Sequence, residues 1–146
     1  MNIAIASDHA GFDLKTMLIT HLRMQGHIVQ DLGPASDESV DYPDFADVVA
    51  RSVANGVADY GVLMCGTGIG MAIAANKIDG VRAASITSPA FAKLAREHND
   101  ANIVTLSARF VEPATNIEIV DVFLNTSFAG DRHALRIDKI SRLEAR

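Results

Sequence analysis

Residues 60–70, Tyr-Gly-Val-Leu-Met-Cys-Gly-Thr-Gly-Ile-Gly, decide the fold of this chain. The first six, from Tyr60 to Cys65, form an unbroken apolar run with the length of a strand. A strand without charged or strongly polar positions is covered on both faces, which is typical of the parallel sheets of α/β proteins. The glycines that follow allow a tight turn into residues 68–77, which we predict to be helical. The stretch therefore predicts one strand–turn–helix unit of a parallel sheet.

Strand and helix alternate in both directions from this unit. The predicted strands are residues 2–6, 27–31, 60–65, 81–86 and 101–106. The predicted helices are one that carries Leu14 to Leu22 and stops at Gly26, one from Pro43 to near Gly56, and residues 68–77, 88–98 and 113–125. This order indicates a single α/β domain over residues 1–146, a three-layer sandwich around a five-stranded parallel sheet. Residues 131–146 form an extra C-terminal helix, which we expect to pack on a partner subunit.

The composition excludes several classes of protein. One cysteine in 146 residues permits neither an intrachain disulfide nor a cysteine-rich zinc site, and it suits a reducing compartment. A formal net charge of −5 argues against a partner such as nucleic acid or an anionic membrane. No segment approaches the ~20 apolar residues that span a bilayer, and residues 1–8 lack the basic start of a signal peptide. We therefore expect a cytoplasmic protein that binds neither nucleic acid nor membranes.

The charge is distributed unevenly along the chain. Residues 1–130 contain eight basic and fifteen acidic residues, whereas residues 131–146 contain five basic and three acidic ones. Arg132 and Arg136 lie four residues apart and so share one face of the predicted C-terminal helix. Two guanidinium groups on one face suit the oxygens of a phosphate, although a solvated basic face has the same pattern.

Ligands of parallel sheets bind at the carboxyl ends of the strands. The segments to inspect are therefore residues 7–11, 65–70, 87–89 and 107–109. The loop from Cys65 to Gly70 has neither the spacing of a dinucleotide fingerprint nor the lysine of a phosphate-binding loop. Its amides can hold an oxyanion or an enediolate, or the loop can be no more than a tight connection.

Cys65 and Thr67 place two reactive groups in this loop. The position of Cys65 between a strand end and a helix start favours the thiolate, although most free cysteines are buried small hydrophobes. Thr67 supplies a hydroxyl donor two residues further on. A thiolate base and a donor beside it can serve one pair of substrate atoms.

Two other segments carry groups that manage protons. Asp8 and His9 follow the first strand, where they can act on protons or a phosphate, or else cap the next helix. His98 and Asn99 close the helix before the last strand, where Asn99 can serve as its C-cap. No His, Asp or Glu spacing predicts a metal site, and no nucleophile elbow is present. We assign no role to His21 and His27, which we expect to stand alone on the surface.

These stretches occur together with Asp41-Tyr42-Pro43, Ala75-Asn76-Lys77 and Gly80-Val81-Arg82-Ala83. In this combination and order the chain closely resembles the ribose-5-phosphate isomerase B family, which also includes galactose-6-phosphate and allose-6-phosphate isomerases. The resemblance covers nearly the whole chain. It implies a Rossmann-like αβα sandwich, a homodimer or tetramer with active sites shared between subunits, and aldose–ketose isomerisation of a sugar phosphate without a metal or cofactor.

The resemblance also implies roles for individual residues. Cys65 is the base that moves a proton between C1 and C2, although some members use a glutamate elsewhere. Thr67 stabilises the enediolate together with the loop amides, and Asp8 and His98 assist ring opening and proton transfer. The substrate-binding residues that it implies are Gly66, Gly68, Ile69 and Gly70 in the loop, Tyr42 and Asn99 on the sugar, and His9, Arg109, Arg132 and Arg136 on the phosphate.

The substrate that this resemblance favours is ribose 5-phosphate, converted to ribulose 5-phosphate through an enediolate in pentose phosphate metabolism. Two alternatives stay open. The same chemistry can act on a four-carbon or six-carbon sugar phosphate, with selection by Tyr42 and by residues 36–41 and 87–91. A sugar-phosphate sensor on the same fold would bind without turnover, but pure binding needs neither the Cys65–Thr67 pair nor His98.

Overall fold

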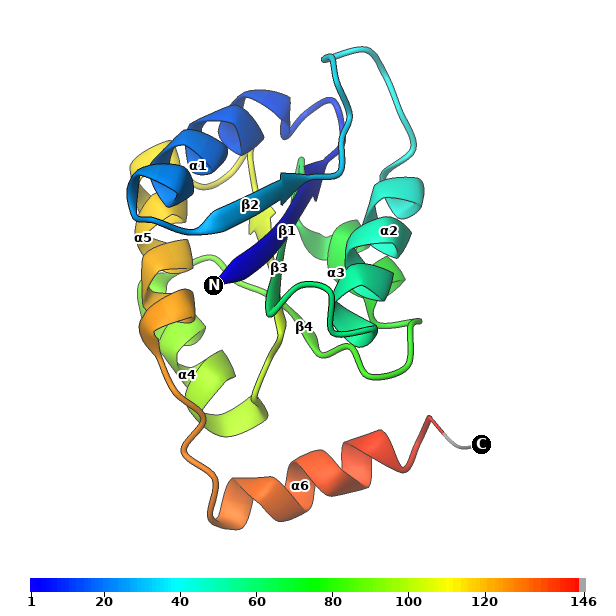
Figure 1. Ribbon diagram of the computed structural model, residues 1–146, viewed down its shortest axis with the longest axis vertical. Helices are drawn as coiled ribbons and strands as arrows, with labels where there is room; N and C mark the ends of the chain where they lie inside the picture. Colours follow the sequence, from blue (N-terminus) through cyan, green and yellow to red (C-terminus); the bar gives the residue numbers. More distant parts are fainter. Residues whose placement is uncertain (145–146) are drawn as a thin grey trace.

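A computed structural model describes residues 1–144 of the chain (Figure 1). Five strands form one fully parallel sheet in the order β2-β1-β3-β5-β4. The strands are β1 (Asn2–Ser7), β2 (Ile28–Asp31), β3 (Tyr60–Cys65), β4 (Ala83–Ser85) and β5 (Ile103–Ser107). The helices are α1 (Phe12–Met24), α2 (Tyr42–Ala54), α3 (Ile69–Ala75), α4 (Pro89–Asn99), α5 (Pro113–Asn125) and α6 (Arg132–Ser141). The predicted α/β sandwich with a parallel sheet is confirmed.

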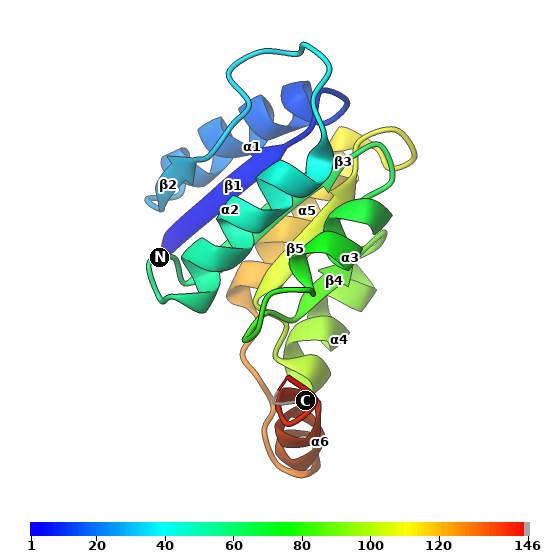
Figure 2. The same cartoon turned by 90° about the vertical axis from the view of Figure 1, so that its right-hand side faces the viewer.

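Helices cover both faces of the sheet, and each face has its own core (Figures 1 and 2). Ile3 and Ile5 of β1 pack with α1, α4 and α5, whereas Ala4 and Ala6 pack with α2 and α3. Successive residues of a strand point to opposite faces, so this alternation divides β1 between the two cores. The central strands β1, β3 and β5 are therefore buried on both sides, as their apolar runs predict.

Local signals in the sequence mark the ends of several helices. Pro43 and Pro89 lie in the first turns of α2 and α4, where their missing N–H groups cost nothing. The Ser88 side chain accepts a hydrogen bond from the Phe91 N–H and so caps α4. Gly26 has a φ of 86°, a conformation that suits glycine, and ends the turn after α1.

The structure corrects the predicted bounds of several elements, and β5 spans Ile103–Ser107 where 101–106 were predicted. β4 has three residues where 81–86 were predicted: Val81 is buried without pairing in the sheet, and Ile86 follows the strand with one hydrogen bond from its N–H to the Thr105 carbonyl of β5 at 3.0 Å. α3 has seven residues where 68–77 were predicted, and α6 ends at Ser141. Residues 145–146 of the predicted C-terminal helix lie outside the described residues. The edge strands β2 and β4 are only partly buried, since each has a neighbour on one side only.

α6 lies beyond the amino ends of the strands, next to the end of α4 (Figures 1 and 2). His133 is its one buried residue among those described. The Glu144 carboxylate, just after the helix, accepts a hydrogen bond from the Gly80 N–H at 2.9 Å. No helix within residues 1–144 is long and apolar enough to cross a membrane.

Candidate active site

Three strands end side by side at the carboxyl edge of the sheet, and their loops are tied to one another. The Asp8 N–H, after β1, donates to the Met64 carbonyl of β3 at 3.1 Å. The Ala108 and Arg109 N–H groups, after β5, donate to the carbonyls of Cys65 and Gly66 at 3.0 and 3.1 Å. These bonds hold the loop after β3, residues 65–70, between its two neighbours.

Cys65 lies inside this loop and is 4% exposed. Its Sγ accepts a hydrogen bond from the Gly68 N–H at 3.1 Å, which gives the sulfur a partner for negative charge. Gly68 has a φ of 79° and packs on the backbone of Leu106, so that a Cβ would lie 2.9 Å from a backbone atom. Only glycine fits there, and this close packing places the Gly68 N–H beneath the sulfur.

Thr67 is the exposed residue of the loop that carries a hydroxyl. Its Oγ1 accepts a hydrogen bond from the Ile69 N–H at 3.2 Å. Since the acceptor side of the hydroxyl is engaged, its proton is free to point to a ligand outside the loop. Thr67 can therefore donate to an oxygen that approaches Cys65 from solvent.

Asp8 and His9 border the loop on its β1 side. Asp8 is buried, and its Oδ1 accepts the Gly11 N–H at 3.1 Å. The Nδ1 of His9 accepts the Val40 N–H at 3.3 Å, so a neutral ring carries its proton on Nε2. His9 thus presents a donor that suits a phosphate oxygen.

Tyr42 and Arg109 flank the loop at its two glycines. A Cβ on Gly70 would lie 2.6 Å from the Tyr42 ring, and one on Gly66 would lie 3.2 Å from the Arg109 guanidinium. The two side chains approach the loop this closely only because these positions are glycine. The predicted residues at this edge are together in one place, which we call the cysteine site; they are Asp8, His9, Tyr42, Cys65, Gly66, Thr67, Gly68, Ile69, Gly70 and Arg109.

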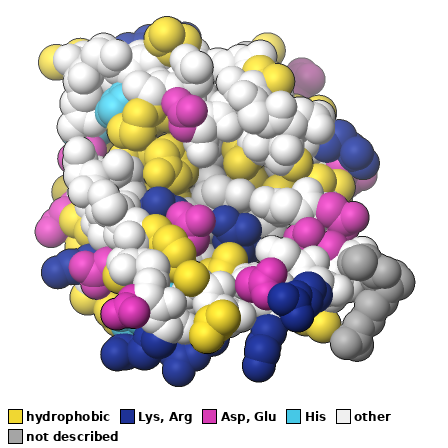
Figure 3. All heavy atoms as spheres, turned by 60° about the horizontal axis from the view of Figure 1, so that its bottom comes forward, with side chains coloured by type: hydrophobic (Ala, Val, Ile, Leu, Met, Phe, Trp, Pro, Cys, Tyr) yellow, Lys and Arg dark blue, Asp and Glu magenta, His cyan; other side chains and the backbone are white. Residues whose placement is uncertain are grey.

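The other four predicted residues are not at this edge. α4 starts after β4 at the carboxyl edge and runs back, so that His98 and Asn99 lie at the amino edge. Arg132 and Arg136 lie on α6, beyond that same edge, and Figure 3 shows the basic side chains along this end of the molecule. We call these four residues the histidine–arginine cluster. One chain does not bring this cluster to Cys65.

His98 and His133 connect the two helices of the cluster. Their rings stack with centroids 4.3 Å apart and planes 14° from parallel. Beside them lies a cavity of about 330 Å³, which is also lined by Glu97, Asp131 and Arg132. Desolvation and the charges near it, chiefly that of His98, lower the pKa of His133 from its ordinary value of 6.5. At neutral pH the stack therefore contains an uncharged His133.

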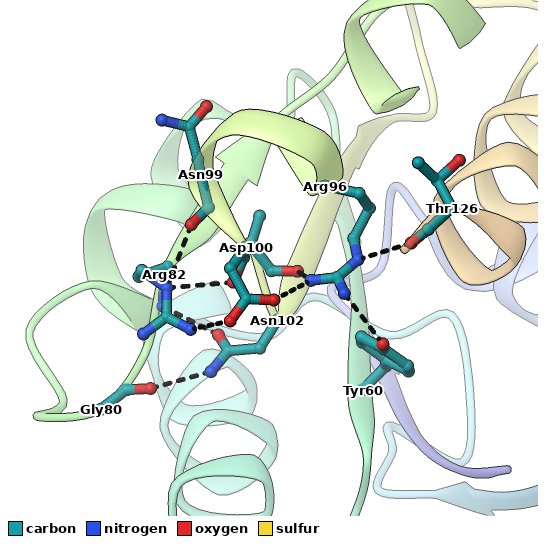
Figure 4. A network of polar contacts seen from close by, with 9 residues as sticks. Tyr60, Gly80, Arg82, Arg96, Asn99, Asp100, Asn102 and Thr126 are labelled. Carbon is teal, nitrogen blue, oxygen red and sulfur yellow. Dashed lines mark hydrogen bonds and ion pairs between the residues drawn. The ribbon is translucent and has the colours of Figure 1, made fainter. Parts of the chain in front are cut away.

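A network of charged groups holds the end of α4 that carries His98 and Asn99 (Figure 4). Asp100, with a φ of 45°, accepts Arg96 at 2.8 Å and Arg82 at 3.1 Å with its two carboxylate oxygens. The Arg82 Nε also donates to the Asn99 and Asp100 carbonyls, at 3.2 and 3.0 Å. Arg96, whose side chain is 6% exposed, donates further to the Ala101 carbonyl and the Tyr60 hydroxyl. This network fixes the helix end and is a feature that our sequence analysis missed.

His21 and His27 were expected to stand alone, and this expectation is wrong. The His27 Nδ1 lies 3.4 Å from the Met1 amino group. The His21 Nε2 lies 2.8 Å from the Asp121 carboxylate, which joins α1 to α5. The partner is 100 residues away, so no local pattern predicts it. Within residues 1–144, no group of three or more His, Cys, Asp or Glu side chains is arranged to hold a metal ion.

The chain is similar to a known protein family and to several solved structures. Residues 3–140 match the family described as Ribose/Galactose Isomerase. Ribose-5-phosphate isomerase B of Escherichia coli is 43% identical over 144 residues, which are 99% of this chain and 97% of that protein. Ribose-5-phosphate isomerase B of Clostridium thermocellum has a TM-score of 0.98 at 47% identity and covers 99% of this chain and 98% of its own.

A further solved structure contains a ligand. It is ribose-5-phosphate isomerase B of Mycoplasma genitalium with bound ribulose 5-phosphate. Its TM-score is 0.95 at 51% identity, over 99% of this chain and 97% of that one. The similarity thus extends over both the cysteine site and the histidine–arginine cluster.

Proposed function

Because this chain belongs to the ribose/galactose isomerase family, we propose that it interconverts ribose 5-phosphate and ribulose 5-phosphate. The observation that carries the proposal is the similarity over nearly the full chain to a ribose-5-phosphate isomerase B with bound ribulose 5-phosphate. The closely related Escherichia coli protein supports the same reaction. The chain is therefore an aldose–ketose isomerase, and its own residues supply the steps below.

Cys65 is the base of the proposed reaction. Once the sugar ring is open, the thiolate removes the proton from C2 of the aldose, and the electron pair forms the C1–C2 double bond of an enediolate. O1 takes up a proton, the O2 hydroxyl gives one up as the C2 carbonyl forms, and the same sulfur returns the carbon-bound proton to C1, which yields the ketose. The Gly68 N–H, 3.1 Å from Sγ, stabilises the thiolate before the first of these steps and after the second.

The enediolate is stabilised by donors of the loop. Negative charge develops on the oxygens at C1 and C2, and donors that are already in place need no reorganisation when it appears. These donors are the Thr67 hydroxyl and the amides of residues 66–70 that do not already donate to Cys65 or Thr67. Asp8 and His98 open the ring and move the protons of the ring oxygen and the carbonyl oxygen.

The phosphate is far from the reacting carbons and supplies binding energy that positions them. His9 and Arg109 bind it from the cysteine site. Arg132 and Arg136 bind it from the histidine–arginine cluster, with the two guanidinium groups exposed on α6. Tyr42 and Asn99 contact the sugar between these ends.

We propose a homodimer because one chain holds the two halves of this machinery at opposite edges of the sheet. A two-fold axis perpendicular to the strands reverses their direction, so it places the amino edge of one copy beside the carboxyl edge of the other. Each cysteine site then faces the histidine–arginine cluster of the partner subunit. The dimer contains two such composite sites.

The surface near β4 is apolar and exposed, as expected for the interface of this proposed dimer. β4 is a short, partly exposed edge strand between α3 and α4 (Figure 2). Large apolar side chains are exposed there on both helices and on the turn after β5: Ile69, Ile73, Phe91, Leu94 and Phe110. Apolar surface of this extent suits contact with a second copy.

We place this activity in the cytoplasm, because a cysteine that acts as a base must stay reduced.

A panel of aldose and ketose phosphates with four, five and six carbons tests the proposed substrate. We expect the highest kcat/KM for ribose 5-phosphate and ribulose 5-phosphate. A higher kcat/KM for a six-carbon or four-carbon sugar phosphate contradicts the assignment of the substrate but retains the chemistry. Tight binding of ribose 5-phosphate without turnover contradicts the assignment as an enzyme.

A further inference from the structure

Two buried hydroxyls of β5 lie beneath the loop of the cysteine site, and the reaction described above does not use them. Thr105 is 0% exposed and Ser107 is 2% exposed. They are two residues apart on the strand and therefore face the same side of it. The Thr105 hydroxyl donates to the Gly68 carbonyl at 2.8 Å, and the Ser107 hydroxyl donates to the Gly66 carbonyl at 2.9 Å.

Each of these loop carbonyls accepts a second hydrogen bond as well. The Gly66 oxygen accepts the Arg109 N–H at 3.1 Å, and the Gly68 oxygen accepts the Ala72 N–H at 3.1 Å. A carbonyl oxygen has two lone pairs, so both oxygens are fully engaged. In a trans peptide the N–H points opposite to the C=O, so the Thr67 and Ile69 N–H groups are turned away from β5.

Both of the peptide groups held from β5 act on Thr67. Its own N–H belongs to the peptide whose carbonyl is held by Ser107. The Ile69 N–H belongs to the peptide held by Thr105, and it donates to the Thr67 Oγ1 at 3.2 Å. Hydrogen bonds on a carbonyl polarise the peptide and strengthen the donor on its other side. Ser107 and Thr105 therefore fix the orientation of the two donors that Thr67 offers to a ligand, its N–H and its hydroxyl.

The Ser107 hydroxyl itself has a fixed direction. Its Oγ accepts the Phe110 N–H at 3.0 Å, which directs its own proton toward Gly66. Thr105 is enclosed completely and has the Gly68 carbonyl as its acceptor. Neither hydroxyl reaches solvent, so neither acts on substrate directly.

We propose that Thr105 and Ser107 are positioning residues of the isomerase, which orient the peptides around Thr67 toward the enediolate. This inference rests on the proposed function, because it needs an enediolate at the loop. It predicts that the two hydroxyls affect the transition state more than the binding of the phosphate. A role in folding alone would not produce this difference.

The test compares Thr105→Val and Ser107→Ala with the wild-type enzyme. Thr105→Val keeps the shape of the side chain and removes the hydroxyl, and we expect kcat to fall about tenfold with KM within about twofold. The probe for the loop is a phosphorylated four-carbon hydroxamic acid, which resembles the enediolate. Its affinity should fall about as much as kcat, since both depend on the same donors. The affinity for inorganic phosphate should stay unchanged.

Two further variants separate positioning from stability. Thr105→Ser restores the hydroxyl and should recover kcat to within about twofold of wild type. Ser52→Ala removes a buried hydroxyl that has no hydrogen-bond partner within residues 1–144, and it should leave kcat unchanged. If Thr105→Val does not fold, Ser107→Ala decides by the same three measurements.

The outcomes distinguish this inference from the function on which it rests. If the wild-type chain does not isomerise ribose 5-phosphate, the proposed function is wrong. If the wild type is active and both folded variants keep its kcat and its affinity for the hydroxamate, the positioning role is wrong. An equal loss of affinity for the hydroxamate and for inorganic phosphate also contradicts it.

Discussion

Cys65 and His98 lie at opposite ends of one parallel sheet. Cys65 ends β3 at the carboxyl edge, where it pairs with Ser107. Gly61, the second residue of the same strand, lies at the amino edge and donates its N–H to the carbonyl of Asn102, which follows His98 by four residues. Gly61 and Cys65 are four residues apart on the strand, which corresponds to about 13 Å. A proton can pass between groups only over hydrogen-bond distance or through one water molecule. This separation supports the proposal that a reaction which uses both residues takes them from two copies of the chain.

Cys65→Ala should lower kcat by about 10³-fold, because it removes the base that transfers the proton between carbons. The Gly68 N–H loses its acceptor, but the loop stays bound to β5 through its carbonyls. Binding of inorganic phosphate, measured by competition, should therefore change little. Turnover close to that of the wild type would disprove the role of Cys65.

Arg136→Ala should raise KM by about tenfold and lower kcat less, because a charge-assisted hydrogen bond to the phosphate is lost. Arg142→Ala is the matched control, since Arg142 is also exposed on the C-terminal segment but pairs with Asp138. Steady-state kinetics with ribose 5-phosphate measure both. An unchanged KM for Arg136→Ala would remove this residue from the phosphate site.

The packing of α6 should weaken as the pH falls. The pKa of His133 is lowered in the folded protein by desolvation and by the neighbouring charges of His98, Arg132 and Arg136. A lowered pKa in the folded state means that this contribution to stability is complete above 6.5 and is lost as the pH falls through the folded value.

His133→Phe keeps an aromatic ring beside His98 without a charge and provides the comparison. Thermal unfolding from pH 7.5 to pH 5 should show a smaller loss of stability for this variant than for the wild type. Parallel losses in the two proteins would show that the His133 stack does not titrate in this range.

Arg96→Met should lower the free energy of unfolding by about 3 kcal/mol, because two backbone carbonyls lose their donor and the Asp100 carboxylate keeps Arg82 alone. The Asp100 side chain is about one-third exposed, so the loss of free energy should lie at the lower end of the range for breaking a buried ion pair. Arg51→Met, which removes an exposed pair with Asp47, should cost less than about 1 kcal/mol. Urea unfolding checks both, and equal effects would contradict the structural role of the network in Figure 4.

Much of the fold follows from short-range patterns in the sequence. The strands are apolar runs of the right length, and Gly26, Pro43 and Pro89 mark helix ends by their backbone chemistry alone. The boundaries of β4 could not be predicted, because Val81 and Ile86 are buried for reasons of packing and look like strand residues. Burial and strand pairing are separate requirements, and apolar residues report only the first.

Part of the candidate site could likewise be predicted from the sequence, and part could not. The cysteine site was accessible to prediction, because its loops all follow strands of a parallel sheet and so meet at one edge. The network of Arg82, Arg96 and Asp100 was not, since its partners come from distant parts of the chain. Thr105 and Ser107 have the appearance of ordinary strand residues, and only the hydrogen bonds to the loop reveal their contact with it.

The composite site is tested most directly by mixing two inactive variants. In a dimer of one Cys65→Ala chain and one His98→Ala chain, one site carries both lesions and the other carries none. After unfolding and refolding of an equal mixture, half of the dimers are hybrids with one intact site of two, so activity should recover to about a quarter of wild type. Each variant treated alone should stay inactive. A mixture with no more activity than the separate variants would contradict a site shared between two copies.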